Sequence, residues 1–461
     1  MLARLVATLL LLTLPLPALG ADVIVINGDA PGVGFNDPTP AMPIGGNFGT
    51  TVGQQALNVF QFAADRWGAN LISDQPIQVI AFFMPLSCTA TSGVLGAAGA
   101  FVYFANVPPA RSGKALAANT WYPAALAEKL TKQDIVVDPT EPFEIISFFN
   151  SELGKPGCLT GNGWYYGLDN QQPANRIDLL AVVLHEFGHG LGFSAGPTNT
   201  NTGARPLNFP SVWERHMLDV SSGKRWLDMT QAERAASARN DLKLVWAGQK
   251  ASNVVPSVLD FGAELVALEP DTLGSNEAVP ANFGAKMPPY LKGLVTAPND
   301  GGGPSLQDGC EPFPAGSDAA GAIVLMNRGV CTFVQKALNA QNAGAIAAVI
   351  ANNVAGLVSP TGTDPSIFIP VVGVTQALGA QLRATPTFAE LRRNTNARAG
   401  TAFNLPRLYA PLTFAPGSSV SHWDVTATPS LLMEPGITPD LTSSVKNPED
   451  LTRRLLTDIG W

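Results

Sequence analysis

The sequence IDLLAVVLHEFGHGLGF, from Ile177 to Phe193, decides how the rest of this chain is interpreted. It contains His185, Glu186 and His189 in the order H-E-x-x-H. Residues four apart lie on the same face of a helix, so both imidazoles can bind one metal ion. Glu186 is then placed to accept a proton from a water molecule on that ion. The stretch therefore predicts a zinc-binding helix with Glu186 as the general base of a hydrolase.

The ends of this helix are marked within the same stretch. Asp178 suits the start, because its carboxylate can accept hydrogen bonds from the unpaired N–H groups there. Gly188, Gly190 and Gly192 are poor helix formers, which predicts an end soon after His189. Apolar residues at helical spacing predict a face that packs on the protein interior: Leu180, Val183, Leu184, Phe187 and Leu191.

Composition describes a globular chain long enough for two or three domains. Of the 461 residues, 46% are hydrophobic and only 14% are charged, which argues against disorder. The net charge of −8 argues against nucleic acid or an anionic membrane as a partner. We expect protein or peptide substrates.

Residues 1–20 have the pattern of a secretory signal peptide. Arg4 provides the positive start, an apolar run follows, and Ala18-Leu19-Gly20 provides small residues for cleavage. Pro15 and Pro17 interrupt the run, and no other stretch has the length of a membrane span. The sequence predicts a secreted or periplasmic protein without a membrane span.

Four cysteines suit an oxidising compartment. Three pairings exist in principle, and proximity in the sequence favours Cys88 with Cys158 and Cys310 with Cys331. No two cysteines have the C-x-x-C spacing of a zinc thiolate site. Calcium is a further option at Asp/Asn-rich loops such as Asn27–Asp29, although the chain has no EF-hand pattern.

Three β-rich segments precede the metal helix, at Ile77–Phe83, Ala100–Phe104 and Phe143–Phe149, and a helix is predicted from Gly53 to Asn70. We expect a three-layer α+β arrangement in which a sheet backs the metal helix. The strand Phe143–Phe149 is expected at the edge, where it could hold an extended substrate.

A second unit has a recognisable pattern. GAIVLMNRGVCTF runs from Gly321 to Phe333, and AGAIAAVIANN runs from Ala343 to Asn353. Together with Ile369-Pro370-Val371-Val372, these segments resemble the protease-associated (PA) domain, a usually non-catalytic α/β module inserted in secreted peptidases. The resemblance implies that Cys310–Cys331 is the module's own disulfide. We expect this module at residues 254–414, between parts of a catalytic domain at 21–253 and 415–461.

The third metal ligand is not decided by the helix. A compact metzincin motif would place a histidine where Ala195 stands, so that motif is broken. A thermolysin-like arrangement would use a glutamate downstream, for which Glu214 is the nearest candidate. His216 and His422 are the remaining histidines of the four in the chain.

The motif H-E-F-G-H-G-L-G-F, followed much later by Ser421-His422-Trp423 and by L-L-M-E-P at residues 431–435, resembles leishmanolysin-type metallopeptidases. The resemblance implies His422 as the third zinc ligand and Met433 as the methionine of the turn beneath the metal. It also implies a metzincin-like catalytic domain that is interrupted by the PA-like module.

The expected function is that of a secreted zinc endopeptidase, in which Glu186 activates water for attack on a peptide bond. The alternative is a secreted binding or adhesion protein that captures partners through the PA-like module and keeps only a structural metal site. The presence of Glu186 favours the enzyme.

Overall fold

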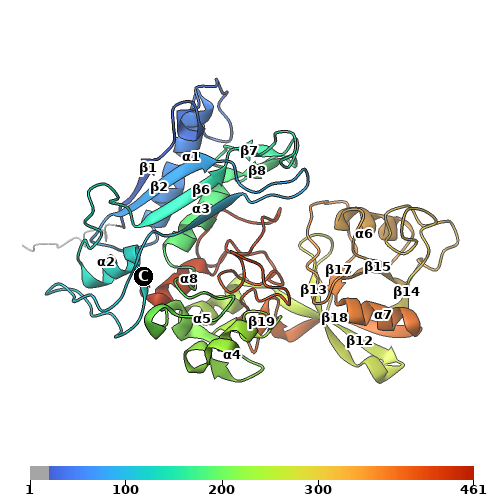
Figure 1. The fold of residues 1–461 in the computed structure, drawn as a ribbon. Helices are drawn as coiled ribbons and strands as arrows, with labels where there is room; N and C mark the ends of the chain where they lie inside the picture. The colour runs from blue at the N-terminus through green and yellow to red at the C-terminus, as the bar shows by residue number, and fades with distance from the viewer. Residues whose placement is uncertain (1–19) are drawn as a thin grey trace, which may run out of the picture.

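The computed structural model describes residues 20–461. The signal peptide predicted for residues 1–20 lies outside the described residues except for Gly20. No helix among the described residues is long and apolar enough to span a membrane. The chain forms two bodies (Figure 1): a main lobe, built from residues 20–260 and 399–461, and a barrel domain from Phe261 to Arg398.

The main lobe contains a four-stranded sheet in the order β1-β2-β6-β3. Its strands are β1 (Val23–Asn27), β2 (Ile77–Met84), β6 (Ile145–Asn150) and β3 (Gly96–Ala100). β1, β2 and β6 are parallel, whereas β3 runs antiparallel to β6 and forms the edge. The strand predicted for the edge, Phe143–Phe149, corresponds to β6 and is paired on both sides. That prediction is wrong, because strand order depends on long-range pairing that a single segment does not encode.

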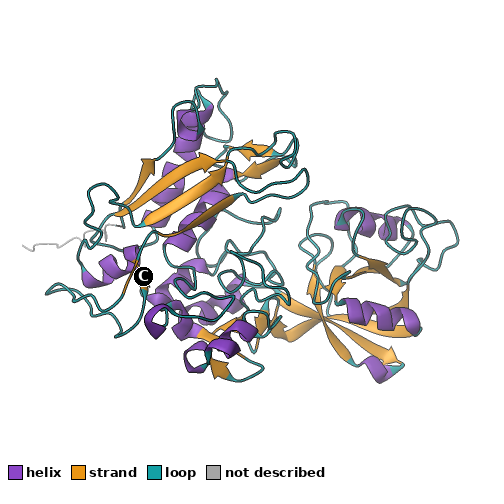
Figure 2. Ribbon diagram, viewed as in Figure 1, coloured by secondary structure: helices purple, strands orange, loops and turns teal. Residues whose placement is uncertain are grey.

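Two helices cover one face of this sheet (Figure 2): α1 (Val52–Gly68) and α3 (Leu179–Gly190). Thr51 caps α1 by accepting the N–H of Gln54. Along β2, buried residues alternate with half-buried ones, so the second face of the sheet is only partly covered. The sheet and helices therefore form two layers, and the expected three-layer arrangement is wrong.

Smaller elements complete the main lobe. Helix α5 (Gln249–Val258) packs against the C-terminal helix α8 (Thr452–Ile459), and the Trp461 indole donates to the Leu191 carbonyl at the end of α3. The chain end is thus fastened to the helix that carries the metal motif. These elements are β4 (Tyr103–Phe104), β5 (Tyr122–Pro123), α2 (Ala124–Thr131), β7 (Gly163–Tyr165), β8 (Arg176–Asp178), β9 (Met217–Asp219), β10 (Lys224–Arg225), α4 (Gln231–Ser237), β11 (Leu244–Trp246), α5 (Gln249–Val258), β19 (Thr401–Ala402), β20 (Leu405–Pro406) and α8 (Thr452–Ile459).

The barrel domain is a closed sheet in the order β12-β13-β17-β16-β15-β14-β18. The strands from β14 through β15 and β16 to β17 are parallel, and β16 is buried along its whole length. The elements are β12 (Phe261–Glu269), β13 (Ser275–Pro280), β14 (Leu291–Thr296), β15 (Ile323–Asn327), α6 (Phe333–Asn342), β16 (Ala347–Ala351), β17 (Val371–Val374), α7 (Gln376–Ala384) and β18 (Thr387–Arg398).

The predicted boundaries of this unit, at residues 254 and 414, need correction. Residue 254 lies inside α5, and Val255, Leu259 and Leu408 belong to the hydrophobic core of the main lobe. The barrel itself begins at Phe261 and ends at Arg398. The composition shift near residue 253 therefore precedes the start of the barrel at Phe261 by about eight residues, because α5 buries its apolar face against the main lobe.

Candidate metal centre

Helix α3 begins and ends as its sequence predicts. Asp178 is its N-cap and accepts the N–H of Leu180 at 2.9 Å. At the other end, Gly192 adopts a φ of +115°, and the N–H of Phe193 returns to the carbonyl of Gly188 at 3.0 Å. The N–H of Gly192 meanwhile donates to His189 O at 3.0 Å. This pair of bonds is a Schellman ending, which favours glycine at the position of Gly192.

Three histidines meet above this helix. His185 Nε2 lies 3.1 Å from His189 Nε2 and 3.2 Å from His422 Nε2. The third side of the triangle, from His189 Nε2 to His422 Nε2, is also 3.2 Å. All three residues are buried, with at most 8% of each exposed. The structure therefore places His422 next to the two histidines of α3, from which it is separated by more than 230 residues of sequence.

The opposite nitrogen of each ring is held by a backbone carbonyl. His185 Nδ1 lies 2.7 Å from Leu432 O, His189 Nδ1 lies 2.8 Å from Phe193 O, and His422 Nδ1 lies 2.9 Å from Ser418 O. A carbonyl only accepts, so each Nδ1 carries the proton and each Nε2 presents a lone pair. The contacts among the three Nε2 atoms are therefore not hydrogen bonds, since none of these atoms has a proton to donate.

Burial keeps the three imidazoles neutral. It lowers the pKa of His185 to about 4 and that of His189 to about 3, and it lowers the pKa of His422 well below its usual value. Three converging lone pairs repel one another unless a cation lies between them. Tetrahedral zinc with bonds of about 2.0–2.1 Å separates its nitrogen ligands by about 3.3 Å, close to the spacing here. The donor set fits a zinc ion with one position open.

Glu186 lies beside this cluster and against the edge strand. Its carboxylate lies near the backbone N–H of Ala98 in β3, and only 5% of the residue is exposed. A Cβ added to Gly96 would lie 2.8 Å from Glu186 Oε1, so glycine is needed for the carboxylate to approach the strand. Burial raises the pKa of Glu186 to about 8. A bound cation would lower that pKa and favour the carboxylate form.

Met433 lies beneath the helix. It is fully buried, and a Cβ added to Gly188 would meet its Sδ at 2.7 Å. The adjacent residue, Leu432, provides the carbonyl that orients His185. The segment around Met433 thus supports α3 by packing and orients His185 by a hydrogen bond.

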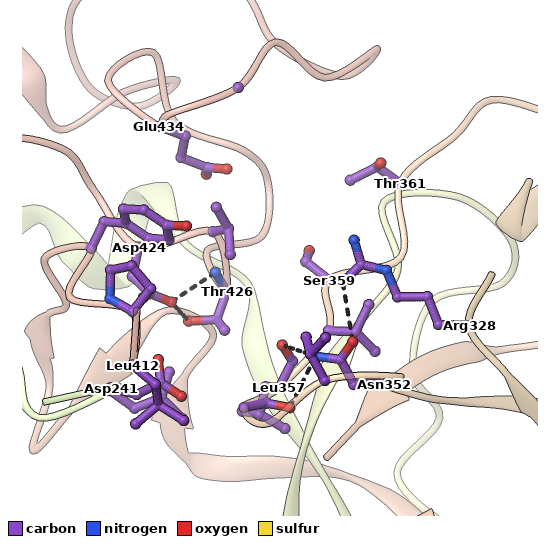
Figure 3. A pocket seen from close by; sticks show the side chains of 18 of the residues that line it. Asp241, Arg328, Asn352, Leu357, Ser359, Thr361, Leu412, Asp424, Thr426 and Glu434 are labelled. Atoms are coloured by element: carbon purple, nitrogen blue, oxygen red, sulfur yellow. Dashed lines mark hydrogen bonds between the residues drawn. The ribbon is translucent and has the colours of Figure 1, made fainter. Parts of the chain in front are cut away.

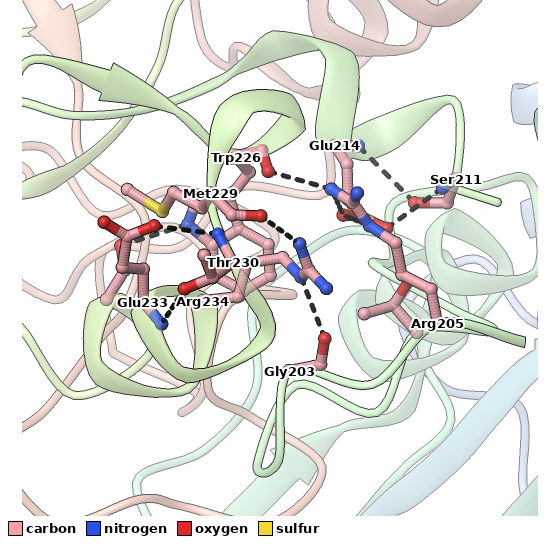
Figure 4. A network of polar contacts seen from close by, with 11 residues as sticks. Gly203, Arg205, Ser211, Glu214, Trp226, Met229, Thr230, Glu233 and Arg234 are labelled. Carbon is pink, nitrogen blue, oxygen red and sulfur yellow. Dashed lines mark hydrogen bonds and ion pairs between the residues drawn. The ribbon is translucent and has the colours of Figure 1, made fainter. Parts of the chain in front are cut away.

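Glu214 and His216, the other two candidates for the third metal ligand, contact other side chains. Glu214 forms a buried ion pair with Arg205 and accepts hydrogen bonds from Thr198 and Ser211 (Figure 4). The His216 ring stacks on Trp246 with ring centroids 5.0 Å apart. Neither residue belongs to the histidine cluster.

The cysteines and the proposed calcium loop have definite partners. Cys88 is bonded to Cys158, and Cys310 is bonded to Cys331. At the loop Asn27–Asp29, the Asp29 carboxylate accepts the N–H groups of Phe35 and Phe83. Among the described residues, no group of three His, Cys, Asp or Glu side chains lies at this loop, so the calcium prediction there has no support from the structure.

A cavity of about 410 Å³ lies between the main lobe and the barrel domain (Figure 3). Asp424 and Glu434 contribute to the wall on the main-lobe side, and Arg328 and Asn352 contribute to the wall on the barrel side. Asp424 lies two residues after His422, and Glu434 directly follows Met433. One wall of the cavity is therefore made by the same segments that hold the metal cluster.

Several residues of this site have no recognisable signal in the sequence. The Leu432 and Ser418 carbonyls act through the backbone, and any residue type could provide them. Gly96 lies in a run of glycine and alanine that does not indicate a strand. The Phe193 carbonyl alone had an indirect signal, because Gly192 marks the turn that presents it.

Comparisons with known proteins identify the barrel domain. Residues 292–382 match the family model described as the PA domain. These residues form a PA domain. They span most of the closed barrel, from β14 to α7, so the predicted resemblance is confirmed for this part of the chain.

Comparison of the chain with curated proteins gives only a partial match. The probable lipoprotein aminopeptidase LpqL of Mycobacterium tuberculosis is 37% identical over 133 residues, which cover 27% of this chain and 26% of that protein. The chain thus matches only about a quarter of this relative's length.

Among solved structures, a zinc aminopeptidase from Bacillus subtilis covers 33% of this chain and 39% of its own, at 23% identity and a TM-score of 0.21. An aminopeptidase from Aneurinibacillus sp. strain AM-1 covers 32% of this chain and 37% of its own, at 20% identity and a TM-score of 0.22. Scores this low do not indicate a shared overall fold.

Proposed function

We propose that this protein is an exported, zinc-dependent endopeptidase of the metzincin type, with His185, His189 and His422 as zinc ligands and Glu186 as general base. The observation that carries the proposal is the convergence of three Nε2 lone pairs beside a buried carboxylate. A site with three imidazole ligands and one open position is typical of catalytic zinc. The resemblance to leishmanolysin-type enzymes and the PA domain support the same function.

Export is supported by the signal-peptide pattern of residues 1–20 and by the two disulfides. The PA domain fits this location, since the resemblance places such modules in secreted peptidases.

The edge strand β3 is the proposed substrate platform. Gly96–Ala100 pairs with β6 on one side only, and the N–H of Ala98 points away from β6 to the Glu186 carboxylate. The free edge of β3 therefore faces the base. An extended peptide that adds to this edge by backbone hydrogen bonds would pass beside Glu186. Such a platform accepts chain on both sides of the cleaved bond, which favours internal cleavage.

A zinc ion bound here would polarise the substrate carbonyl and make water more acidic. Glu186 then holds the water in line with the carbonyl and accepts its proton. The same carboxyl group delivers that proton to the leaving amine, which restores the carboxylate. The three backbone carbonyls keep the imidazoles in one tautomer and one orientation throughout.

The substitution Glu186→Gln tests this proposal. We expect zinc content to stay as in the wild type, while hydrolysis of an internally quenched peptide with blocked ends falls by about 10²-fold or more. Zinc is measured by atomic absorption, and cleavage is measured with and without a chelator. A zinc-loaded Glu186→Gln protein with the wild-type rate would refute the role of Glu186. A wild-type rate that ignores the chelator would refute the zinc mechanism.

Aminopeptidase activity is the second candidate, because the relative that shares 37% identity over 133 residues is described as an aminopeptidase. The blocked peptide separates the two activities. Cleavage of an aminoacyl p-nitroanilide without any cleavage of the blocked peptide would favour the aminopeptidase.

A further inference from the structure

A second cluster of potential metal ligands lies in the PA domain, on the long connection between β14 and β15. Asp300, Asp308 and Glu311 each place one carboxylate oxygen within 4.8 Å of those of the other two. Asp300 is 3% exposed and Asp308 is 1% exposed, whereas Glu311 is partly buried. This cluster contains no histidine, and it lies in a different domain from the histidine cluster.

One oxygen of each carboxylate lacks a partner. Asp300 Oδ2 accepts the N–H of Gly309 at 2.8 Å, and Asp308 Oδ1 accepts the N–H of Cys310 at 2.9 Å. The remaining oxygens, Asp300 Oδ1 and Asp308 Oδ2, are buried and accept no hydrogen bond from residues 20–461, and the same holds for Glu311 Oε2. Burying an anionic oxygen without a partner is costly, so native proteins pair such groups with a cation.

The nearby lysine offsets only part of this negative charge. Lys336 is fully buried, and its Nζ donates to the Asp308 backbone carbonyl at 2.6 Å and lies 3.2 Å from Cys310 Sγ. None of the ion pairs formed by the described residues involves any of the three acidic side chains. Three ionised carboxylates and one ammonium leave an excess of two negative charges, the charge that a divalent cation neutralises.

We propose that Asp300, Asp308 and Glu311 bind a calcium ion. Their carboxylate oxygens form a hard donor set, and Cys310 is unavailable as a thiolate because it is bonded to Cys331. Ca²⁺ binds oxygen at about 2.3–2.6 Å, so ligands on opposite sides of the ion are about 4.6–5.2 Å apart. Each carboxylate places an oxygen within 4.8 Å of the other two, so all three can reach one such ion. Calcium is favoured over magnesium, because Mg²⁺ dehydrates reluctantly and is seldom held by protein ligands alone.

The ion would fasten the β14–β15 connection to the barrel. Asn339 in α6 already donates to the carbonyl of Gly309, next to Asp308. With calcium bound, the segment from Asp300 to Glu311 is held by the ion, by α6 and by the disulfide. The expected consequence is a calcium-dependent thermal stability of the PA domain.

The experiment uses the full-length protein, stripped with a chelator and reloaded with one equivalent of zinc. Titration with calcium chloride in a calorimeter should show one site of about micromolar to millimolar affinity, the range of calcium sites in proteins. The thermal midpoint should rise by several degrees at saturating calcium, since a ligand that binds only the folded state stabilises it. Magnesium chloride should bind more weakly.

The variants Asp308→Asn and Asp300→Asn should each lose calcium binding and the calcium-dependent shift, while keeping zinc. Asp318→Asn is the matched control, because Asp318 is exposed on the same connection. Two substitutions guard against a variant that fails to fold, which circular dichroism would reveal. Wild-type protein that binds no calcium at about 10 mM would overturn the proposal. Asn variants that bind calcium as tightly as the control would also overturn it.

Discussion

At the scale of single residues, the metal centre depends on which imidazole completes the triangle. His422 Nε2 lies 3.2 Å from both helix histidines, whereas His216 stacks on Trp246. We expect His422→Ala to purify with almost no zinc and His216→Ala to retain about one zinc per molecule. Atomic absorption on both variants decides the matter, and zinc at the wild-type level in His422→Ala would contradict the assignment.

The space beside Glu186 is a second residue-scale feature. In Gly96→Ala the new methyl group would lie within 3.0 Å of the Glu186 carboxylate and displace it. Because the displaced group is a side chain, we expect stability and zinc content to change little and kcat to fall by about 10²-fold.

Gly99→Ala on the same strand is the control, since nothing lies within 4 Å of its added Cβ. Equal kcat values in the two variants would show that the position of Glu186 against β3 does not matter.

At the scale of elements, the contact between α2 and the start of β6 contains two buried acids. Glu144 accepts the N–H of Gln78 at 2.6 Å, and Glu128 accepts the N–H groups of Ile135 and Val136. Burial, together with the charge of nearby Glu128, raises the pKa of Glu144 to about 8. At neutral pH, Glu144 is therefore protonated in the folded protein.

This raised pKa predicts the direction of a pH effect. The folded protein binds a proton that the unfolded chain releases above about pH 4.5, so the stabilisation is lost as pH rises through about 8. We expect the urea midpoint of the wild type to fall between about pH 6 and about pH 9, and that of Glu144→Gln to fall less. Glu141→Gln is the matched control because Glu141 is exposed. Parallel pH profiles for the wild type and Glu144→Gln would contradict this interpretation.

At the scale of the whole molecule, the PA domain is an insertion whose two ends lie side by side. The N–H of Ala399 donates to the carbonyl of Asp260 at 3.0 Å, just outside the barrel. The main lobe has its own hydrophobic core, which includes residues on both sides of the insertion such as Leu259 and Leu408. The three histidines proposed as zinc ligands all belong to the main lobe.

We therefore expect a variant in which a short Gly-Ser linker replaces residues 261–398 to fold and to bind about one zinc per molecule. It would lose the ion pair between Arg407 and Glu277, which joins the two bodies at 2.6 Å. Circular dichroism and atomic absorption check the outcome. A soluble but zinc-free product would show that the PA domain is needed to hold the segment that carries His422.

The sequence by itself determined the features that depend on neighbouring residues. The metal helix, its Asp178 cap and its end at Gly192 follow from periodicity and backbone preference within one stretch. The PA domain was recognisable because its strands, helices and turns follow one another in short order.

Only the tertiary structure decided which of Glu214, His216 and His422 lies next to the two histidines of α3. It also decided which strand forms the sheet edge and where the inserted domain begins. It also brought together the three acidic side chains of the PA domain and the carbonyls that orient the imidazoles. The physical reason is the same in each case. These contacts join residues that are distant in the sequence or act through the backbone, so packing of the whole chain selects them and no local pattern records them.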